Sequence, residues 1–406
     1  MTPTLRRRVL FAALYFSEGA PIGFLWWALP TRLRAAGVEV AAITTLLGVL
    51  VLPWALKFLG APLMDILRTP RWPLRAWIAS CQIVMGLCLL ATLAFDWRAD
   101  FAAIGALLLL HAVFAASQDV AVDAYALQIV RPEHRGAINA WMQGGMLAGR
   151  AIFGGGALLL DARVGATTTI LLLVAAIWSS LLVLAVAGEP EVFPQAGTTV
   201  AARRREFLSA LGAALRRRST WLILAFATIG GAGFEAVGLL VGPYLLERGF
   251  SQSAIGGFLF LPTVLAMLAG AAAAGVLADR VDRRAGVAMT LVATAATIAV
   301  MGSSPALSGE VVLALLALLY FLIGALTTAS YALFMDFTDP RLGATQLSAA
   351  MSATNLCESW SAFAVGRLTT MLGFGAAFSW MAAVSLLALP CLWWLPKPEE
   401  QDTRCV

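Results

Sequence analysis

The stretch from Val311 to Leu333 reads VVLALLALLYFLIGALTTASYAL and holds no charged side chain. A helix that crosses the hydrocarbon core of a bilayer needs about 20 predominantly apolar residues, and this stretch is long enough. The rest of the chain is similar, because 60% of its 406 residues are hydrophobic and only 13% are charged. Soluble domains carry about 25% charged residues, so composition excludes a soluble protein and intrinsic disorder. We therefore expect an all-α protein that crosses a membrane many times.

Apolar runs separated by polar turns predict twelve membrane-spanning helices. A strand interpretation fails because the runs are too long and lack an alternation of period two. The longest polar stretch, 188–219, is basic and predicts a linker between two six-helix halves, 1–187 and 220–396, with a tail at 397–406. The expected spans are 9–30, 42–64, 76–95, 101–129, 138–160, 165–187, 220–246, 252–277, 285–303, 309–335, 345–370 and 374–395.

The placement of the 28 lysines and arginines predicts the orientation of the chain. With a cytoplasmic N-terminus, 20 of them fall in cytoplasmic segments, five fall in the opposite loops, and three lie within spans. Basic residues accumulate in cytoplasmic loops, so we expect both termini and the linker to be cytoplasmic. The basic residues form no contiguous patch, so the net charge of +5 does not indicate a nucleic-acid partner. The expected partner is the lipid bilayer.

Three motifs recur in the same order in both halves. GVEVAAI at 37–43 and GFSQSAI at 249–255 precede the second and eighth spans. GAPLMD at 60–65 and GVLADR at 275–280 follow those spans, and AYAL at 124–127 is matched by SYAL at 330–333. The common offset indicates a parallel duplication of six spans, one of the repeat arrangements known among transporters.

This pattern resembles the major facilitator superfamily, whose loop motif is well matched by the second-half copy and less well by the first, where no arginine follows Asp65 directly. About the first 160 residues resemble the AmpG-like branch of that superfamily, which includes muropeptide permeases, RhtX/FptX-type siderophore permeases and acetyl-CoA transporters. The stretches that carry this resemblance are YFSEGAP at 15–21, PWALKFLGAPLMD at 53–65, SQDVAVDAY at 117–125 and PEHRG at 132–136. The branch usually has a tyrosine-arginine pair in the fifth span, where this chain reads WMQGGM at 141–146 and the arginine is displaced to Arg150.

The resemblance implies a secondary transporter that works by alternating access and imports a bulky polar small molecule across the bacterial inner membrane with protons. A siderophore is favoured over a muropeptide, because the chain has no room for two additional helices and its first span is aromatic. We expect a monomer without a cofactor. No Walker-type loop is present, so ATP is not expected to drive transport.

Ionisable residues inside spans cost at least ~2.5–3.5 kcal/mol on insertion scales, so they normally face a cavity or a partner. Asp119 and Asp123 are four residues apart and share a helix face, where mutual repulsion suits a site that loads and releases a proton. Lys57 and Arg150 are the expected compensating cations; the alternative is that such pairs only hold helices together. The candidates for proton coupling and for the solute cavity are Glu18, Lys57, His111, Gln118, Asp119, Asp123, Tyr125, Arg150, Glu235, Asn355 and Glu358.

Several of these candidates have a second interpretation. Glu18 is followed by Gly19 and Pro21, which predicts a weak or broken helix of the kind that marks binding sites, or simply a kink with a hydrogen-bonded glutamate. His111 either titrates near neutral pH or is a hydrogen-bonded packing residue. Phe16, Phe24, Trp26 and Trp27 form either an aromatic wall for a ring-bearing solute or an interfacial belt.

Charged residues at the expected cytoplasmic ends of spans predict a gate. Carboxylates at a junction between helix and loop can pair with arginines and hold one conformational state. The gate candidates are Asp65, Arg135, Asp279, Arg280 and Arg283.

Two other classes of protein remain as alternatives. A membrane-embedded enzyme would need a metal cluster or a nucleophile with a base, but no zincin motif or nucleophile elbow occurs, so we expect neither catalysis nor a bound metal. A receptor or scaffold that kept a transporter fold without transport would have no reason to retain costly intramembrane charges.

Overall fold

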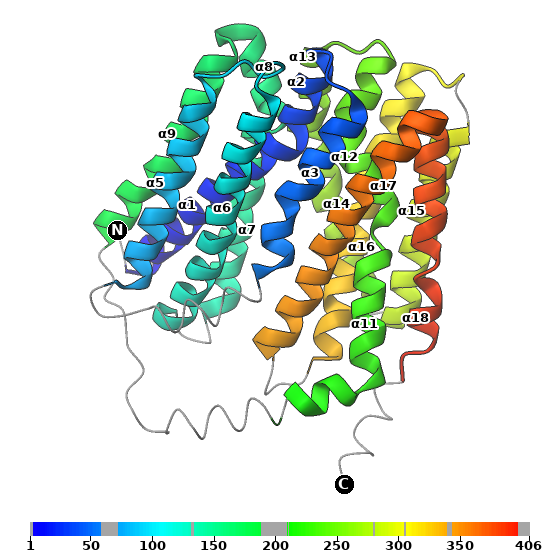
Figure 1. Ribbon diagram of the computed structural model, residues 1–406. Helices are drawn as coiled ribbons and strands as arrows, with labels where there is room; N and C mark the ends of the chain where they lie inside the picture. Colours follow the sequence, from blue (N-terminus) through cyan, green and yellow to red (C-terminus); the bar gives the residue numbers. More distant parts are fainter. Residues whose placement is uncertain are drawn as a thin grey trace. The chain divides into compact units, whose positions relative to one another are not determined.

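The computed structural model describes residues 3–57, 72–130, 134–187, 209, 211–278, 281–303, 306–338 and 343–396. The elements in these ranges are helices (Figure 1). Among them, nine helices are long and apolar enough to cross a membrane, or ten if one bent pair counts as a single span. A shorter apolar helix covers Val40–Ala55, and the longest of the nine contains a kink. The multi-pass helical character is confirmed, whereas the count of twelve and the two equal halves stay predictions.

The first compact unit combines Met1–Phe193 with Gly238–Val264. Its helix α1 packs along α7 and α9, and α5 packs against both α6 and α9. The helices of this unit are α1 (Pro3–Gly23), η1 (Phe24–Ala28), α2 (Leu29–Ala35), α3 (Val40–Ala55), α5 (Leu74–Thr92), α6 (Phe101–Ile129), α7 (Arg135–Phe153), α8 (Gly155–Val164), α9 (Ala166–Ala187) and α13 (Gln252–Phe260).

Helix α1 continues through Gly19 and Pro21 to Gly23, so the helix is not broken directly after Glu18, as one of the two interpretations of this segment expected. The chain instead widens into one π-helical turn at Phe24–Ala28 and then resumes as α2. Pro30 lies in the first turn of α2. Because proline has no N–H, it cannot donate a hydrogen bond back to the preceding turn. The first span is therefore one long rod with a local irregularity beyond Glu18.

The glycines that suggested a break allow α1 and α7 to approach closely. A Cβ on Gly19 would lie 2.1 Å from the carbonyl oxygen of Met146, and a Cβ on Gly145 would lie 2.1 Å from that of Ala12. A Cβ on Gly149 would likewise lie 2.5 Å from the carbonyl oxygen of Phe16 and 2.7 Å from the amide nitrogen of Ala20. Small residues permit such backbone contact between membrane helices, and here they hold α1, the helix that carries Glu18, close to α7.

The second compact unit combines Pro194–Val237 with Leu265–Val406. Its first span is interrupted at Gly230 and Gly231, between α11 and α12, and α17 bends at Gly373, whose φ is +79°. Helices α14 and α16 approach through Gly270 and Gly324. The helices of this unit are α11 (Arg218–Ile229), part of α12 (Ala232–Glu247), part of α14 (Pro262–Ala278), α15 (Arg283–Ser303), α16 (Gly309–Asp336), α17 (Gly343–Leu386) and α18 (Leu389–Trp393).

Candidate functional site

An ion pair between Lys57 and Asp119 lies inside the first unit. Lys57 follows the last turn of α3, Asp119 is on α6, and 2.7 Å separate Nζ from Oδ2. The side chains are only 13% and 8% exposed, so both charges are largely removed from water. The two residues come from helices far apart in sequence, so this pair could not be chosen from spacing alone.

Asp123 lies one helical turn beyond Asp119 and has a different environment. Its Oδ1 accepts a 2.5 Å hydrogen bond from the hydroxyl group of Tyr15 on α1. Asp123 is exposed, whereas Asp119 is only 6% exposed. The pair of carboxyl groups therefore has one member at the surface and one in the interior. Tyr15 was not among the predicted site residues, because it only meets Asp123 once α1 and α6 are packed.

Glu18 brings a third carboxyl group to this place. It is 3% exposed, and its side chain contacts Asp119 within hydrogen-bonding reach and interacts electrostatically with Asp123 and Lys57. Its Oε2 atom accepts no hydrogen bond from a donor. We call Glu18, Lys57, Asp119 and Asp123 the carboxyl cluster: three acidic groups and one cation from three helices.

Amide and hydroxyl groups continue the polar interior beside the carboxyl cluster. The Ser17 hydroxyl donates to the carbonyl oxygen of Leu14 and accepts hydrogen bonds from Gln82 at 3.0 Å and Gln118 at 3.2 Å. Ser17, Gln82 and Gln118 are fully buried. The Oε1 atoms of both glutamines have no hydrogen-bond partner. Gln118 was predicted from its helix face, whereas Ser17 and Gln82 carried no distinguishing signal.

His111 is fully buried two turns before Gln118 on α6. Its Nδ1 lies 3.0 Å from the carbonyl oxygen of Met85 on α5, and its Nε2 has no partner. This geometry favours the interpretation of His111 as a hydrogen-bonded packing residue. Tyr125 is likewise fully buried, with its ring 5.9 Å from that of Phe11.

Arg150 lies beside the first span, at Trp27 and Gly23. Its guanidinium carbon lies 5.2 Å from the ring centroid of Trp27, and its backbone packs against Gly23. Its Nε is buried without a hydrogen bond. Among the described residues, Lys57 is the cation that forms an ion pair with Asp119, and none of the ion pairs includes Arg150.

The predicted aromatic wall is mostly packed inside the protein. Phe24 is fully buried, and Trp26 and Trp27 are 7% and 3% exposed. The Trp26 ring packs edge-on against the Trp54 ring, with 5.7 Å between the ring centroids. The guanidinium carbon of Arg32 lies 4.8 Å from the centroid of the Phe24 ring. Phe16, at 6.4 Å from the Phe153 ring, is the one that is only half-buried.

Two further ion pairs join helices at the α2 end of the first unit. Arg32 donates to both carboxylate oxygens of Asp161 on α8, and the two side chains are 13% and 15% exposed. Arg34 bonds Glu247 on α12 at 2.9 Å. Close by, α8 meets α13 through Gly155, where a Cβ would lie 2.2 Å from the amide nitrogen of Phe260. Neither acidic partner was predicted.

In the second unit, Glu235 on α12 and Glu358 on α17 both interact electrostatically with the buried thiol of Cys357. Glu358 follows Cys357 directly in the sequence, whereas Glu235 reaches the neighbourhood of this thiol from another helix. Asn355 is half-buried on the same helix as Glu358. Trp360, also on α17, donates to the carbonyl oxygen of Thr228 on α11 at 2.8 Å, which holds the two helices together beside the interruption in the first span.

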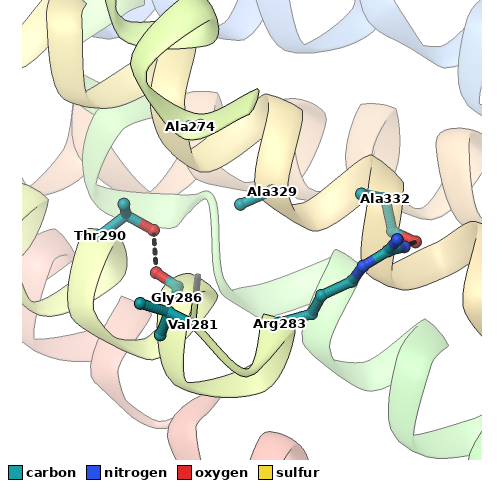
Figure 2. A pocket seen from close by; sticks show the side chains of 7 residues that line it. All are labelled: Ala274, Val281, Arg283, Gly286, Thr290, Ala329 and Ala332. Carbon is teal, nitrogen blue, oxygen red and sulfur yellow. Dashed lines mark hydrogen bonds between the residues drawn. The ribbon is translucent and has the colours of Figure 1, made fainter. Parts of the chain in front are cut away.

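One gate candidate is placed by the structure. Arg283 begins α15 and donates to Asp336 at the end of α16 at 2.5 Å and to the carbonyl oxygen of Ala332 at 3.3 Å. Figure 2 shows Arg283 reaching toward Ala332 at the edge of a small hollow. Asp336 was not predicted. Asp65, Asp279 and Arg280 lie outside the described residues, and of Arg135 only its position at the start of α7 is described.

The hollow in Figure 2 is a packing feature. It is lined by Ala274, Val281, Arg283, Gly286, Thr290, Ala329 and Ala332. The Thr290 hydroxyl donates a 2.9 Å hydrogen bond to the carbonyl oxygen of Gly286. Within the part of the chain that the structure describes, no three His, Cys, Asp or Glu side chains are grouped to hold a metal ion.

Long apolar helices with charges paired inside the bundle define a multi-pass membrane protein with a polar interior. The profile of the Major Facilitator Superfamily matches residues 9–364, and the chain belongs to this family of transporters. It is 24% identical to the transporter designated AmpG 4 of Rickettsia conorii over 93% of this chain and 94% of that protein. The AmpG-like resemblance is thereby confirmed.

A second relative is the anhydromuropeptide permease of Escherichia coli K12, which is 26% identical over 68% of this chain and 56% of the permease. Among solved structures, a D-xylose–proton symporter matches with a TM-score of 0.74 at 13% identity, over 98% of both chains. The nucleoside transporter NupG matches with a TM-score of 0.74 at 11% identity, over 97% of this chain and 99% of that chain. At these identities the structural matches show the shared fold.

Proposed function

We propose that this transporter imports an anhydromuropeptide-like solute across the bacterial inner membrane by alternating access, driven by protons that bind at the carboxyl cluster. The observation that carries the proposal is the contact of Glu18 with Asp119 beside the Lys57 ion pair. Three carboxyl groups near one lysine would leave an excess of negative charge in a low dielectric, where unpaired charge is expensive. One proton shared by Glu18 and Asp119 reduces that excess and satisfies their contact.

The exposure of the cluster supplies a route for the proton. Asp123 is exposed and lies one turn from Asp119 on α6, while Glu18 is almost fully buried. A proton that enters at Asp123 reaches the interior carboxyl groups over a short distance. The hydroxyl group of Tyr15 holds Asp123 in place.

The proton and Lys57 compete for Asp119. When Asp119 is ionised, its pair with Lys57 ties the end of α3 to α6. When Asp119 is neutral, the Coulomb attraction that holds this pair is lost, and the end of α3 is free to move. Protonation is thereby linked to a movement of helices, which is what coupling requires.

The choice of solute rests on the relatives and on the aromatic residues. The name of the Escherichia coli relative, an anhydromuropeptide permease, points to anhydromuropeptides. The aromatic first span had favoured a siderophore, but Phe24, Trp26 and Trp27 are buried among protein groups. A siderophore is therefore kept as the comparison solute. The inner-membrane location, the cytoplasmic termini and the monomeric state belong to the same proposal.

Uptake by purified protein in lipid vesicles tests this function. A radiolabelled disaccharide tripeptide with a 1,6-anhydro sugar is the probe, and a ferric hydroxamate siderophore is the comparison. We expect faster uptake of the tripeptide when the vesicle interior is alkaline, and loss of that advantage with a protonophore. Uptake that does not depend on the pH gradient would refute proton coupling. Uptake of the siderophore without uptake of the tripeptide would refute the anhydromuropeptide-like solute.

A further inference from the structure

Helix α7 exposes two different faces. Ala137, Trp141, Gly144 and Ala148 are exposed and form an apolar stripe with the spacing of one helix face. Asn139 and Gln143 are also exposed but lie on another face, and Arg150 follows at i+11, which returns to that face on a helix of 3.6 residues per turn. Exposed amide side chains inside a membrane helix belong on the side of water or solute rather than of lipid. The polar face of α7, defined by Asn139, Gln143 and Arg150, is therefore an aqueous face.

Arg150 ends this polar face with an unused hydrogen-bonding edge. Its guanidinium carbon lies over the Trp27 ring, 5.2 Å from the centroid, within the range of a cation–π contact. Nε is its one nitrogen that is buried without a partner, so the two terminal nitrogens reach accessible surface. An arginine presents its donors as a rigid planar fork that matches an oxyanion in a bidentate way.

The neighbouring carboxylates of the first unit are already engaged. Asp119 pairs with Lys57, Asp123 accepts from Tyr15, and Asp161 pairs with Arg32. In the described part of the chain, no carboxylate pairs with Arg150. An intramembrane cation without an anion carries a free-energy cost that a bound anionic group would offset.

We propose that Arg150, held over the Trp27 ring, binds a carboxylate group of the transported solute, and that Asn139 and Gln143 line the approach to it. This inference rests on the proposed function for its setting, since the carboxylate belongs to the solute. It adds the chemical class that the site selects, an acidic rather than a neutral solute. The proposal also assigns two binding sites within the first unit: the carboxyl cluster binds the proton, and the polar face of α7 binds the anionic group of the solute.

A structural role for Arg150 is the competing explanation. The cation over the Trp27 ring could serve only to hold α1 against α7. A lysine at position 150 would keep the positive charge and the attraction to the ring but would lose the planar fork. Arg150→Lys therefore separates anion recognition from packing, and Arg150→Gln removes both. Arg163, an exposed arginine at the end of α8, provides the matched control as Arg163→Gln.

Thermal unfolding in detergent tests the subsite without knowledge of the solute. A ligand that binds the folded state raises the melting temperature. We expect succinate, compared with chloride at equal ionic strength, to raise the melting temperature of the wild type and of Arg163→Gln. Arg150→Gln should show no rise and Arg150→Lys a smaller one. Equal rises in all four proteins, or none in the wild type, would overturn the proposal.

Uptake in vesicles then tests selectivity with the anhydro tripeptide and its carboxyl-amidated form. A hydrogen bond to a charged group is worth roughly 1.5–3 kcal/mol, or about 10- to 100-fold in affinity. We expect the wild type to prefer the free acid by that factor, and Arg150→Gln to remove the preference by weakening the acid alone. If Arg150→Gln keeps the preference of the wild type for the free acid, the proposed carboxylate subsite is wrong. If the wild type carries neither form, the proposed solute fails, while the succinate measurement still decides the subsite.

Discussion

Replacing Asp119 by asparagine is expected to abolish uptake driven by a pH gradient. The substitution removes the group for which the proton and Lys57 compete, and it leaves the largely buried lysine without its ion-pair partner. Breaking a buried ion pair by removal of one partner costs about 3–5 kcal/mol, so the variant should also unfold more readily. Uptake with and without a gradient, together with the melting temperature, measures the two effects separately.

A double variant distinguishes coupling from mere helix pairing. Removing both partners of a buried pair is often neutral for stability, so Lys57→Met combined with Asp119→Asn should recover most of the lost stability. Proton-driven uptake should not recover. Glu39→Gln, at an exposed position before α3, is the matched acidic control. Restored proton-driven uptake in the double variant would mean that the pair only holds α3 and α6 together.

Adjacent glycines on α7 should respond in opposite ways to alanine. A Cβ on Gly145 would lie 2.1 Å from the carbonyl oxygen of Ala12, whereas a Cβ on Gly144 would meet nothing within 4 Å. Overpacking costs typically about 1–3 kcal/mol and occasionally more, and a clash with backbone cannot be relieved by a side-chain rotation. Gly145→Ala should therefore lower stability by at least that amount and separate Glu18 from its neighbours.

Gly144→Ala should be neutral or slightly stabilising, because alanine in a helix interior is favoured over glycine by roughly 0.5–1 kcal/mol. Thermal unfolding of the two purified variants, with uptake as the second readout, measures the difference. Similar melting temperatures for both would contradict the close approach of α1 and α7.

The membrane-spanning helices could be predicted because length and hydropathy are local properties of the chain. The family could be predicted because its motifs are short and ordered. The continuity of the helix after Glu18 has a physical reason. Glycine and proline weaken an isolated helix, but in the folded protein the helix brings Gly19 into close contact with Met146, and this packing stabilises it. Tertiary packing overrides local propensity in such cases.

The candidate site was only partly predictable, for a different reason. The acidic residues of the carboxyl cluster could be predicted because a charged residue inside an apolar run is easily recognised. Their partners could not: Tyr15, Ser17 and Gln82 are ordinary residues until three helices are packed together. Asn139 and Gln143 were missed because their exposure on one face of α7 is a property of the packed bundle. Arg150 was conspicuous, but its neighbour Trp27 could not be inferred from spacing.

The proton coupling that we propose requires a proton held between Glu18 and Asp119, beside the Lys57 ion pair. Difference infrared spectroscopy of the purified protein detects the C=O stretch of a neutral carboxyl group directly. We expect this band in the wild type and in Glu39→Gln, and its loss in Glu18→Gln. A wild type without the band, or a Glu18→Gln variant that keeps it unchanged, would contradict a proton held at Glu18.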